Sequence, residues 1–158
     1  MKSRELQSLW WEWLATSEKL VRSLHEQTVA LTLRDPARME KVQPALDHLL
    51  TRMQDIDDRA LAEAQKLCED SGVRPGLRDL VGFLGKEEGM QLQALANRMI
   101  VATREVQKLM NKNRALIENE LTYINGTLTL IAKAATEPKG PYHTQKAVAS
   151  SVLMDQAA

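Results

Sequence analysis

The feature that most constrains the fold is the stretch after Gly89, where nothing interrupts a helix for more than forty residues. Apolar side chains recur there at the spacing of about 3.6 residues that places them on one face of an α-helix. The pattern misses once, at Asn113 and Arg114. We therefore predict one very long helix, from about residue 90 to residue 135. Its apolar positions are Leu92, Ala96, Met99, Thr103, Val106, Met110, Ile117, Leu121, Ile124, Leu128, Ile131 and Ala135.

The segment 121-LTYINGTLTLI-131 contains a local signal against this helix. Asn125-Gly126 is a preferred pair for the two-residue turn of a β-hairpin, and the residues on both sides of it favour strands. A lone two-stranded hairpin is only marginally stable in water, however, and the sequence predicts no other strand that it could join. Glycine inside a helix costs only about 1 kcal/mol relative to alanine. We therefore expect the helix to continue through Asn125-Gly126.

Two further helices are predicted in the first seventy residues. Apolar positions from Glu5 to about Leu33 follow a helical stripe, and a second stripe runs from Met39 to Leu67 with a spacing of three and four residues. Between them, Asp35 predicts an N-cap and Pro36 the first helical position. Pro44 lies within the second stripe, where it predicts a small kink or a later helix start.

Two turn-forming clusters separate these helices from the long one. The segment 71-SGVRPG-76 ends the second helix and 85-GKEEG-89 breaks the chain again, with a short amphipathic helix expected from Leu77 to Leu84. The fold is therefore expected to be all-α, an elongated antiparallel helical bundle whose long helix extends roughly 70 Å. We expect a bundle domain at residues 1–136 and a weakly structured C-terminal tail at residues 137–158.

The composition excludes several classes of function. The chain carries 21 basic and 21 acidic residues, whereas a protein that binds nucleic acid normally has a basic excess or a basic face. No apolar run approaches the roughly 20 residues of a membrane span, and Glu5 and Glu12 interrupt the apolar core that a signal peptide needs. The single cysteine, Cys68, excludes an internal disulfide and suits a reducing compartment. We expect a cytoplasmic protein with no nucleic-acid partner and no membrane insertion.

The sequence contains no pattern of catalytic or metal-ligating residues. His25, His48 and His143 all stand outside the Glu-x-x-His pairs of helical metal sites, and the acidic cluster 55-DIDD-58 is typical of a solvated helix face. A phosphate-binding glycine loop and a serine-centred elbow are also missing. We therefore expect no enzymatic activity, no metal and no cofactor.

Two features can be explained either by packing or by partner binding. Trp10 and Trp13 share the apolar stripe of the first helix, whereas Trp11 points about a third of a turn away, toward a helix edge or solvent. An exposed tryptophan is a favoured anchor in protein interfaces. Asn113 places a polar side chain on an apolar face, where it either fixes the register between helices or contacts a partner helix.

The segment 113-NRALIENELTYINGTLTLIAKAATEPKGPY-142 resembles the C-terminal part of the FlgN family of flagellar export chaperones. That family carries an Asn followed three residues later by Leu-Leu or Leu-Ile, then a helix of evenly spaced apolar residues, a short proline-containing linker and a Tyr. In the places of the two glycines that commonly follow this Tyr, the chain has His143 and Lys146. The matching residues are Asn113, Leu116, Ile117, Pro138 and Tyr142.

The resemblance implies a cytoplasmic, non-enzymatic chaperone of the flagellar type III export system. FlgN-like proteins bind the hook-associated proteins FlgK and FlgL before secretion, keep them unassembled and deliver them to the export gate protein FlhA. In that family the C-terminal region binds a client helix and the tail Tyr docks at FlhA. Tyr142 would have the docking role here.

An amphipathic client helix can bind along an apolar stripe through anchors at helical spacing. We therefore expect client binding by the apolar face of the long helix, which three apolar tail residues would cover when no client is present. A self-associating helical protein, in which the same stripe forms a homodimer, and an enzyme with a scattered site are the alternatives; the chaperone itself would be a monomer or a weak homodimer. The expected client-binding residues are Asn113, Leu116, Ile117, Leu121, Ile124, Leu128, Ile131, Val148, Val152 and Leu153.

Overall fold

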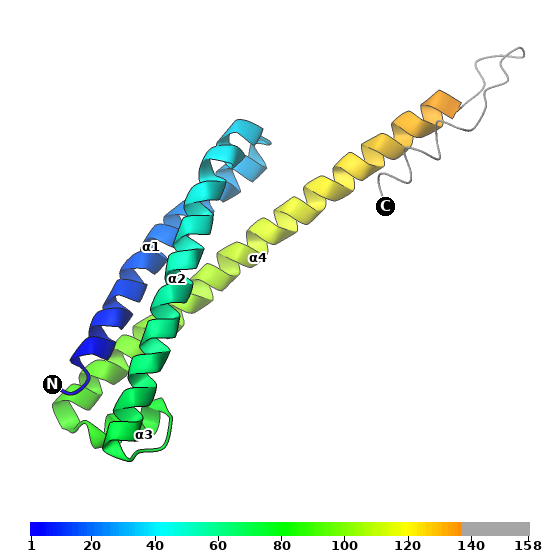
Figure 1. Ribbon diagram of the computed structural model, residues 1–158. Helices are drawn as coiled ribbons and strands as arrows, with labels where there is room; N and C mark the ends of the chain where they lie inside the picture. The colour runs from blue at the N-terminus through cyan, green and yellow to red at the C-terminus, as the bar shows by residue number, and fades with distance from the viewer. Residues whose placement is uncertain (137–158) are drawn as a thin grey trace, which may run out of the picture. The chain divides into compact units, whose positions relative to one another are not determined.

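The computed structural model describes residues 1–136, and four α-helices account for nearly all of them (Figure 1). These residues contain no strand, so the all-α prediction with one long C-terminal helix is confirmed. The long helix begins at Lys86 rather than near residue 90. The helices are α1 (Arg4–Thr32), α2 (Pro36–Ser71), α3 (Leu77–Phe83) and α4 (Lys86–Thr136).

The chain divides into two compact units, and the boundary falls inside α4. The first unit is Met1–Asn113 and the second begins at Arg114. The division into a bundle domain at residues 1–136 and a tail at residues 137–158 stays a prediction, because the expected tail lies outside the described residues.

In the first unit, α1 and α2 are joined by a three-residue connection and lie side by side in opposite directions (Figure 1). The Asp35 carboxylate accepts a hydrogen bond of 3.1 Å from the backbone N–H of Arg38, and Pro36 begins α2, as predicted. The helix continues through Pro44, so a later start is wrong. The cap at Asp35 already fixes the first turn of α2 upstream of this proline.

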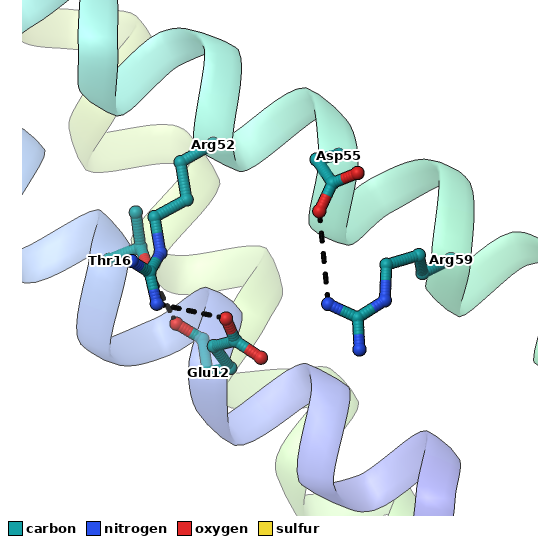
Figure 2. Close-up of polar contacts among 5 residues, drawn as sticks. All are labelled: Glu12, Thr16, Arg52, Asp55 and Arg59. Atoms are coloured by element: carbon teal, nitrogen blue, oxygen red, sulfur yellow. Dashed lines mark hydrogen bonds and ion pairs between the residues drawn. The ribbon is translucent and has the colours of Figure 1, made fainter.

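Figure 2 shows polar contacts along the α1–α2 pair. Arg52 Nη2 of α2 lies 3.0 Å from Glu12 Oε1 of α1, and the Thr16 hydroxyl donates to the Glu12 carbonyl oxygen at 2.8 Å. Asp55 and Arg59 form a second ion pair within α2, at 3.8 Å. These side chains are largely exposed, and exposed pairs of this kind contribute at most about 1 kcal/mol each. The apolar core must therefore supply most of the stability.

That core consists of two clusters of buried side chains. One cluster contains residues of α1, α2 and α4. The other lies at the opposite end of the unit and contains residues of all four helices, α3 included. Full burial of each leucine or isoleucine contributes about 1.5–3 kcal/mol. The first cluster comprises Trp13, Leu20, Leu24, Val42, Leu46, Met53, Ile56, Val106 and Leu109; the second comprises Leu6, Leu9, Ala60, Leu67, Cys68, Leu80 and Leu92.

The predicted face of α4 is buried or half-buried from Leu92 to Val106, and beyond Val106 the buried positions follow heptad spacing rather than the ideal helical period. Leu109 is buried there, whereas Met110, which was predicted on this face, is 41% exposed. Helices that wind around one another require a 3.5-residue repeat, so the contact face departs from the 3.6 period over several turns. On this spacing Asn113 is the next buried position rather than an interruption. The positions at this spacing are Leu92, Leu95, Met99, Ala102, Val106, Leu109 and Asn113, all of them buried or half-buried. Ala96 and Thr103, which the ideal period also predicts, are buried and half-buried beside them.

The predicted end of α2 is confirmed and involves a left-handed glycine. Gly72 has φ 65°, its N–H donates to the Glu69 carbonyl oxygen at 3.1 Å, and the Val73 N–H donates to the Cys68 carbonyl oxygen at 3.0 Å. This pair of bonds is the Schellman arrangement, which satisfies carbonyl groups that the end of a helix leaves without partners.

Only one glycine of the 85–89 cluster breaks the chain. Gly85, with φ 86°, separates α3 from α4, while Gly89 lies inside the first turns of α4. A Cβ atom at Gly89 would lie 2.5 Å from the carbonyl oxygen of Val81, so this glycine allows α4 to approach the backbone of α3. The sequence pattern alone could not distinguish this packing role from a break.

Candidate interaction surface

A run of exposed apolar side chains lies on the part of α4 that belongs to the second unit. The predicted stripe recurs at spacings of three and four residues, which place its members on one helix face. Contiguous exposed apolar surface is typical of an interaction site. The exposed fractions are 37% for Ile117, 54% for Leu121, 44% for Ile124, 36% for Leu128 and 55% for Ile131.

The same segment is poor in charge. No Asp, Glu, Lys or Arg occurs from Leu121 to Ala132, although the solvent-facing surface of a helix is normally charged. The hydroxyl groups of Thr122, Thr127 and Thr129 donate to carbonyl oxygens four residues earlier, at 2.9 to 3.0 Å. Even these polar side chains are thus satisfied by the helix itself. The segment is suited to contact with another apolar surface rather than to chemical catalysis.

The helix continues through Asn125-Gly126, which confirms the helical prediction and excludes a hairpin there. A Cβ atom at Gly126 would meet no heavy atom within 4 Å, apart from the backbone of its own turns. Unlike Gly89, this glycine therefore has no packing reason among the described residues. It lies about half a turn away from the apolar stripe, because each residue advances a helix by about 100°.

Asn113, the last residue of the first unit, is only 2% exposed and binds α1. Its Nδ2 atom donates to the Leu24 carbonyl oxygen and to Gln27 Oε1, both at 2.9 Å, and the Thr28 hydroxyl donates to its Oδ1 atom at 2.5 Å. These contacts support the interpretation that Asn113 fixes the register between α1 and α4. Its expected contact with a client stays a prediction.

The exposed stripe and the arrangement of helices can be compared with known proteins. The model of the FlgN protein family matches residues 1–147. This chain belongs to the FlgN family. The match extends far beyond the C-terminal segment 113–142 that resembles the family. It makes the chain a flagellar export chaperone in the general sense, from a family of chaperones rather than of enzymes. No curated protein and no solved structure matches the chain.

Of the remaining predicted site residues of this FlgN-family protein, only Leu116 lies within the described residues. Leu116 is half-buried at the start of the second unit. Tyr142, Val148, Val152 and Leu153 lie outside the described residues, so their expected roles in docking and client binding stay predictions.

Residues 1–136 contain neither a candidate metal-binding cluster nor a candidate membrane-spanning helix. They contain no group of three or more His, Cys, Asp or Glu side chains that could bind a metal ion. None of their helices is long and apolar enough to cross a membrane. His25 and His48 are exposed on α1 and α2.

The three tryptophans of α1 separate into core and surface. Trp13 is buried and Trp10 is half-buried, which agrees with their predicted place in the core, and Trp11 is half exposed. The Arg98 guanidinium of α4 lies over the Trp11 ring, 4.9 Å from the ring centroid. An exposed Trp with a stacked Arg combines two residue types that are enriched in interface hot spots.

Sequence reasoning missed a groove that runs between α1 and α4 in the first unit. Its volume is about 630 Å³, and its walls include Leu14 and Val21 of α1 and Val101 of α4. The signal in the sequence was a second apolar edge on α1, where Trp11, Leu14 and Val21 are separated by three and seven residues. The stronger stripe that forms the core masked this edge.

Proposed function

We propose that this FlgN-family protein is a cytoplasmic chaperone that binds the hook-associated proteins FlgK and FlgL. It prevents their premature assembly and delivers them to the export gate protein FlhA. The observation that carries this proposal is the exposed, uncharged apolar stripe of α4 from Ile117 to Ile131. Family membership supports a chaperone of flagellar export, and the stripe supplies a surface for the client.

A client helix would lie along α4 and place its own apolar anchors against the stripe. Helices pack in this way when apolar residues recur at i, i+3, i+4 and i+7 on both partners. Covering these side chains removes apolar surface from water on both proteins, and this burial is the driving force for binding. The same contact would sequester the client helix that otherwise drives assembly. Delivery to FlhA is assigned to Tyr142, on the basis of the family resemblance.

The second candidate function is self-association without a client. The same stripe would then pair with a second copy of the chain, because an apolar helix face can pair with itself as well as with a partner. Sedimentation of the purified protein at low concentration separates the two functions. A stable dimer through the stripe favours self-association, and a monomer or weak dimer favours the chaperone.

The proposal is tested by co-purification of FlgK and FlgL with the chain and its variants. We expect the Leu121→Asp/Leu128→Asp variant to lose client binding, because two charges would enter an apolar contact, while circular dichroism and unfolding stay unchanged. Thr122→Asp is the matched control, since it adds a charge on another face of the same helix. If the double variant unfolds, the stripe is core and the proposal fails; it also fails if the variant binds clients normally.

Truncation after Ala135 tests the tail separately. Client capture by the full chain alone would place essential binding residues in the tail, beyond the stripe. Capture by both chains would place the site on the helices, as proposed. Failure of both the full and the truncated chain to capture FlgK or FlgL would favour self-association.

A further inference from the structure

The helices α1 and α4 run in the same direction and stay in step along the first unit (Figure 1). Contacts at the N-cap, in the first third and near the end of α1 join residues whose numbers differ by 85, 87 and 86. They are Ser3 with Glu88, Trp11 with Arg98, and Gln27 with Asn113. With this nearly constant offset, Glu18 of α1 lies at the same level as Glu105 of α4.

Both glutamates line the groove between α1 and α4, on opposite walls. Apolar side chains line the groove on either side of this level, Leu14 and Val101 on one side and Val21 on the other. Both carboxylates are exposed, and neither forms an ion pair with a described residue. Two like charges on facing walls favour a cation between them.

The charges of the groove follow a simple order. Arg98, stacked on Trp11, lies seven residues below the glutamate level on α4, and Arg22 lies four residues above it on α1. Along its length the groove is thus positive, negative and positive. A partner helix that matches it has the opposite order: a basic side chain at the centre, apolar neighbours three or four residues away, and acidic side chains about four residues from the centre on one side and about seven on the other.

A second copy of this chain does not match the groove. The order positive, negative, positive is symmetric, so two such grooves facing each other would bring like charges together. The exposed stripe of another copy has no charged residue from Leu121 to Ala132 to place between the glutamates. The segment 147-AVASSVLMDQAA-158 contains no Lys or Arg either. The basic residues of the tail, Lys139 and Lys146, stand in 137-EPKGPYHTQK-146, whose two prolines and one glycine disfavour the helix that the groove would bind.

We infer that the α1–α4 groove binds a second helix of the hook-associated client, with a Lys or Arg between Glu18 and Glu105. This inference rests on the proposed function and adds a second contact to the stripe of α4. In the first unit, α2 does not line the groove, so a helix bound there would complete a four-helix arrangement around α1 and α4. Trp11 and Arg98 lie at one end of the groove as anchors.

The test measures the affinity of purified, monomeric FlgK and FlgL for the full chain by calorimetry at low and high salt. We expect Glu18→Lys/Glu105→Lys to weaken binding at least tenfold at low salt and to remove most of its salt dependence, with Glu18→Gln/Glu105→Gln in between. The matched control is Glu26→Lys/Glu69→Lys, which changes the net charge equally at exposed positions outside the groove. It should bind as the unmodified chain does.

A photo-crosslinking amino acid at Val101 locates the client directly. We expect it to attach to FlgK or FlgL in the unmodified background, and attachment should fall in the Glu18→Lys/Glu105→Lys variant. Equal affinity of the groove and control variants, or no crosslink at Val101, overturns the inference and leaves the proposed function intact. A groove variant that changes only the self-association of the free chain assigns the groove to a second copy and also overturns it. No binding of either client by the unmodified chain overturns both proposals.

Discussion

The side-chain amide of Asn113 donates a hydrogen bond of 2.9 Å to the backbone carbonyl oxygen of Leu24, across 89 residues of sequence. With Gln27 and Thr28 as further partners, the amide of α4 is satisfied entirely by α1. A buried polar side chain that is fully satisfied in one alignment loses its partners in any other. This contact therefore fixes how far α4 slides along α1, and with it the alignment of the groove walls.

Replacing Asn113 should destabilise the first unit. Asn113→Ala leaves buried polar atoms of α1 without their partner, so we expect the free energy of unfolding to fall by about 1–3 kcal/mol. Urea unfolding followed by circular dichroism measures this change. Asn111→Ala is the control, because Asn111 is exposed on the same helix and should change stability by less than about 0.5 kcal/mol. Equal effects of the two substitutions would contradict the register-fixing role.

A methyl group at Gly89 should also destabilise the protein. The new Cβ atom would lie 2.5 Å from the carbonyl oxygen of Val81, and a backbone atom cannot move aside as a flexible side chain can. We expect Gly89→Ala to reduce the free energy of unfolding by about 1–3 kcal/mol, the usual cost of overpacking. Thermal unfolding provides the measurement, and an unchanged midpoint would show that α4 does not approach α3 as closely as described.

Alanine at Gly126 should have the opposite effect and stabilise the helix. Space around this glycine is open among the described residues, and alanine favours a helix over glycine by about 1 kcal/mol. We expect Gly126→Ala to slow amide hydrogen exchange in the second unit. Client affinity should be retained, because Gly126 lies away from the stripe. Faster exchange would indicate that the glycine is needed for a conformation other than this helix.

The lowered pKa of Glu88 predicts that the free energy of unfolding decreases in acid. Burial alone would raise the pKa of its carboxyl, but hydrogen bonds from the Ser3 hydroxyl at 2.6 Å and the Ser3 backbone N–H at 2.7 Å outweigh it, and the pKa lies below the ordinary 4.5. A lowered folded-state pKa contributes stability that is present above 4.5 and lost as the pH falls through the folded value. The stability difference between the unmodified chain and Glu88→Gln should therefore shrink with falling pH. A pH series of urea unfolding curves checks this, and a constant difference would contradict it.

The raised pKa of Asp57 predicts that its contribution to the free energy of unfolding changes with pH in the opposite direction to that of Glu88. Burial raises the pKa of its carboxyl above 3.8, Asp58 adds to the shift, and the nearby Trp13 indole N–H offsets it only in part. That N–H forms no hydrogen bond in the described structure. A raised carboxyl pKa favours the folded state below the unfolded value, and this advantage is lost as the pH rises through the folded value. Asp57→Asn should accordingly gain stability over the unmodified chain as the pH rises; a difference independent of pH would refute this assignment.

Local sequence patterns determined the helices and most of their ends. Asp35 and Pro36 begin α2 and Gly72 ends it, because capping depends on side chains and dihedral angles within a few residues. The long helix continues through Asn125-Gly126 because an amphipathic period outweighs a single turn signal. The apolar stripe of α4 was also predicted, since its repeat of three or four residues is a local pattern, whereas the exposure of the stripe depends on which helices lie beside it.

Tertiary structure decided which residues far apart in the chain meet. Only the packing of α4 against α1 buries Asn113, selects Leu109 over Met110 and aligns Glu18 with Glu105. Only the closeness of α3 to α4 explains Gly89. These pairings depend on the relative position of helices, which side-chain volumes and a 3.5-residue repeat set together, whereas local periodicity specifies only which face of one helix is apolar.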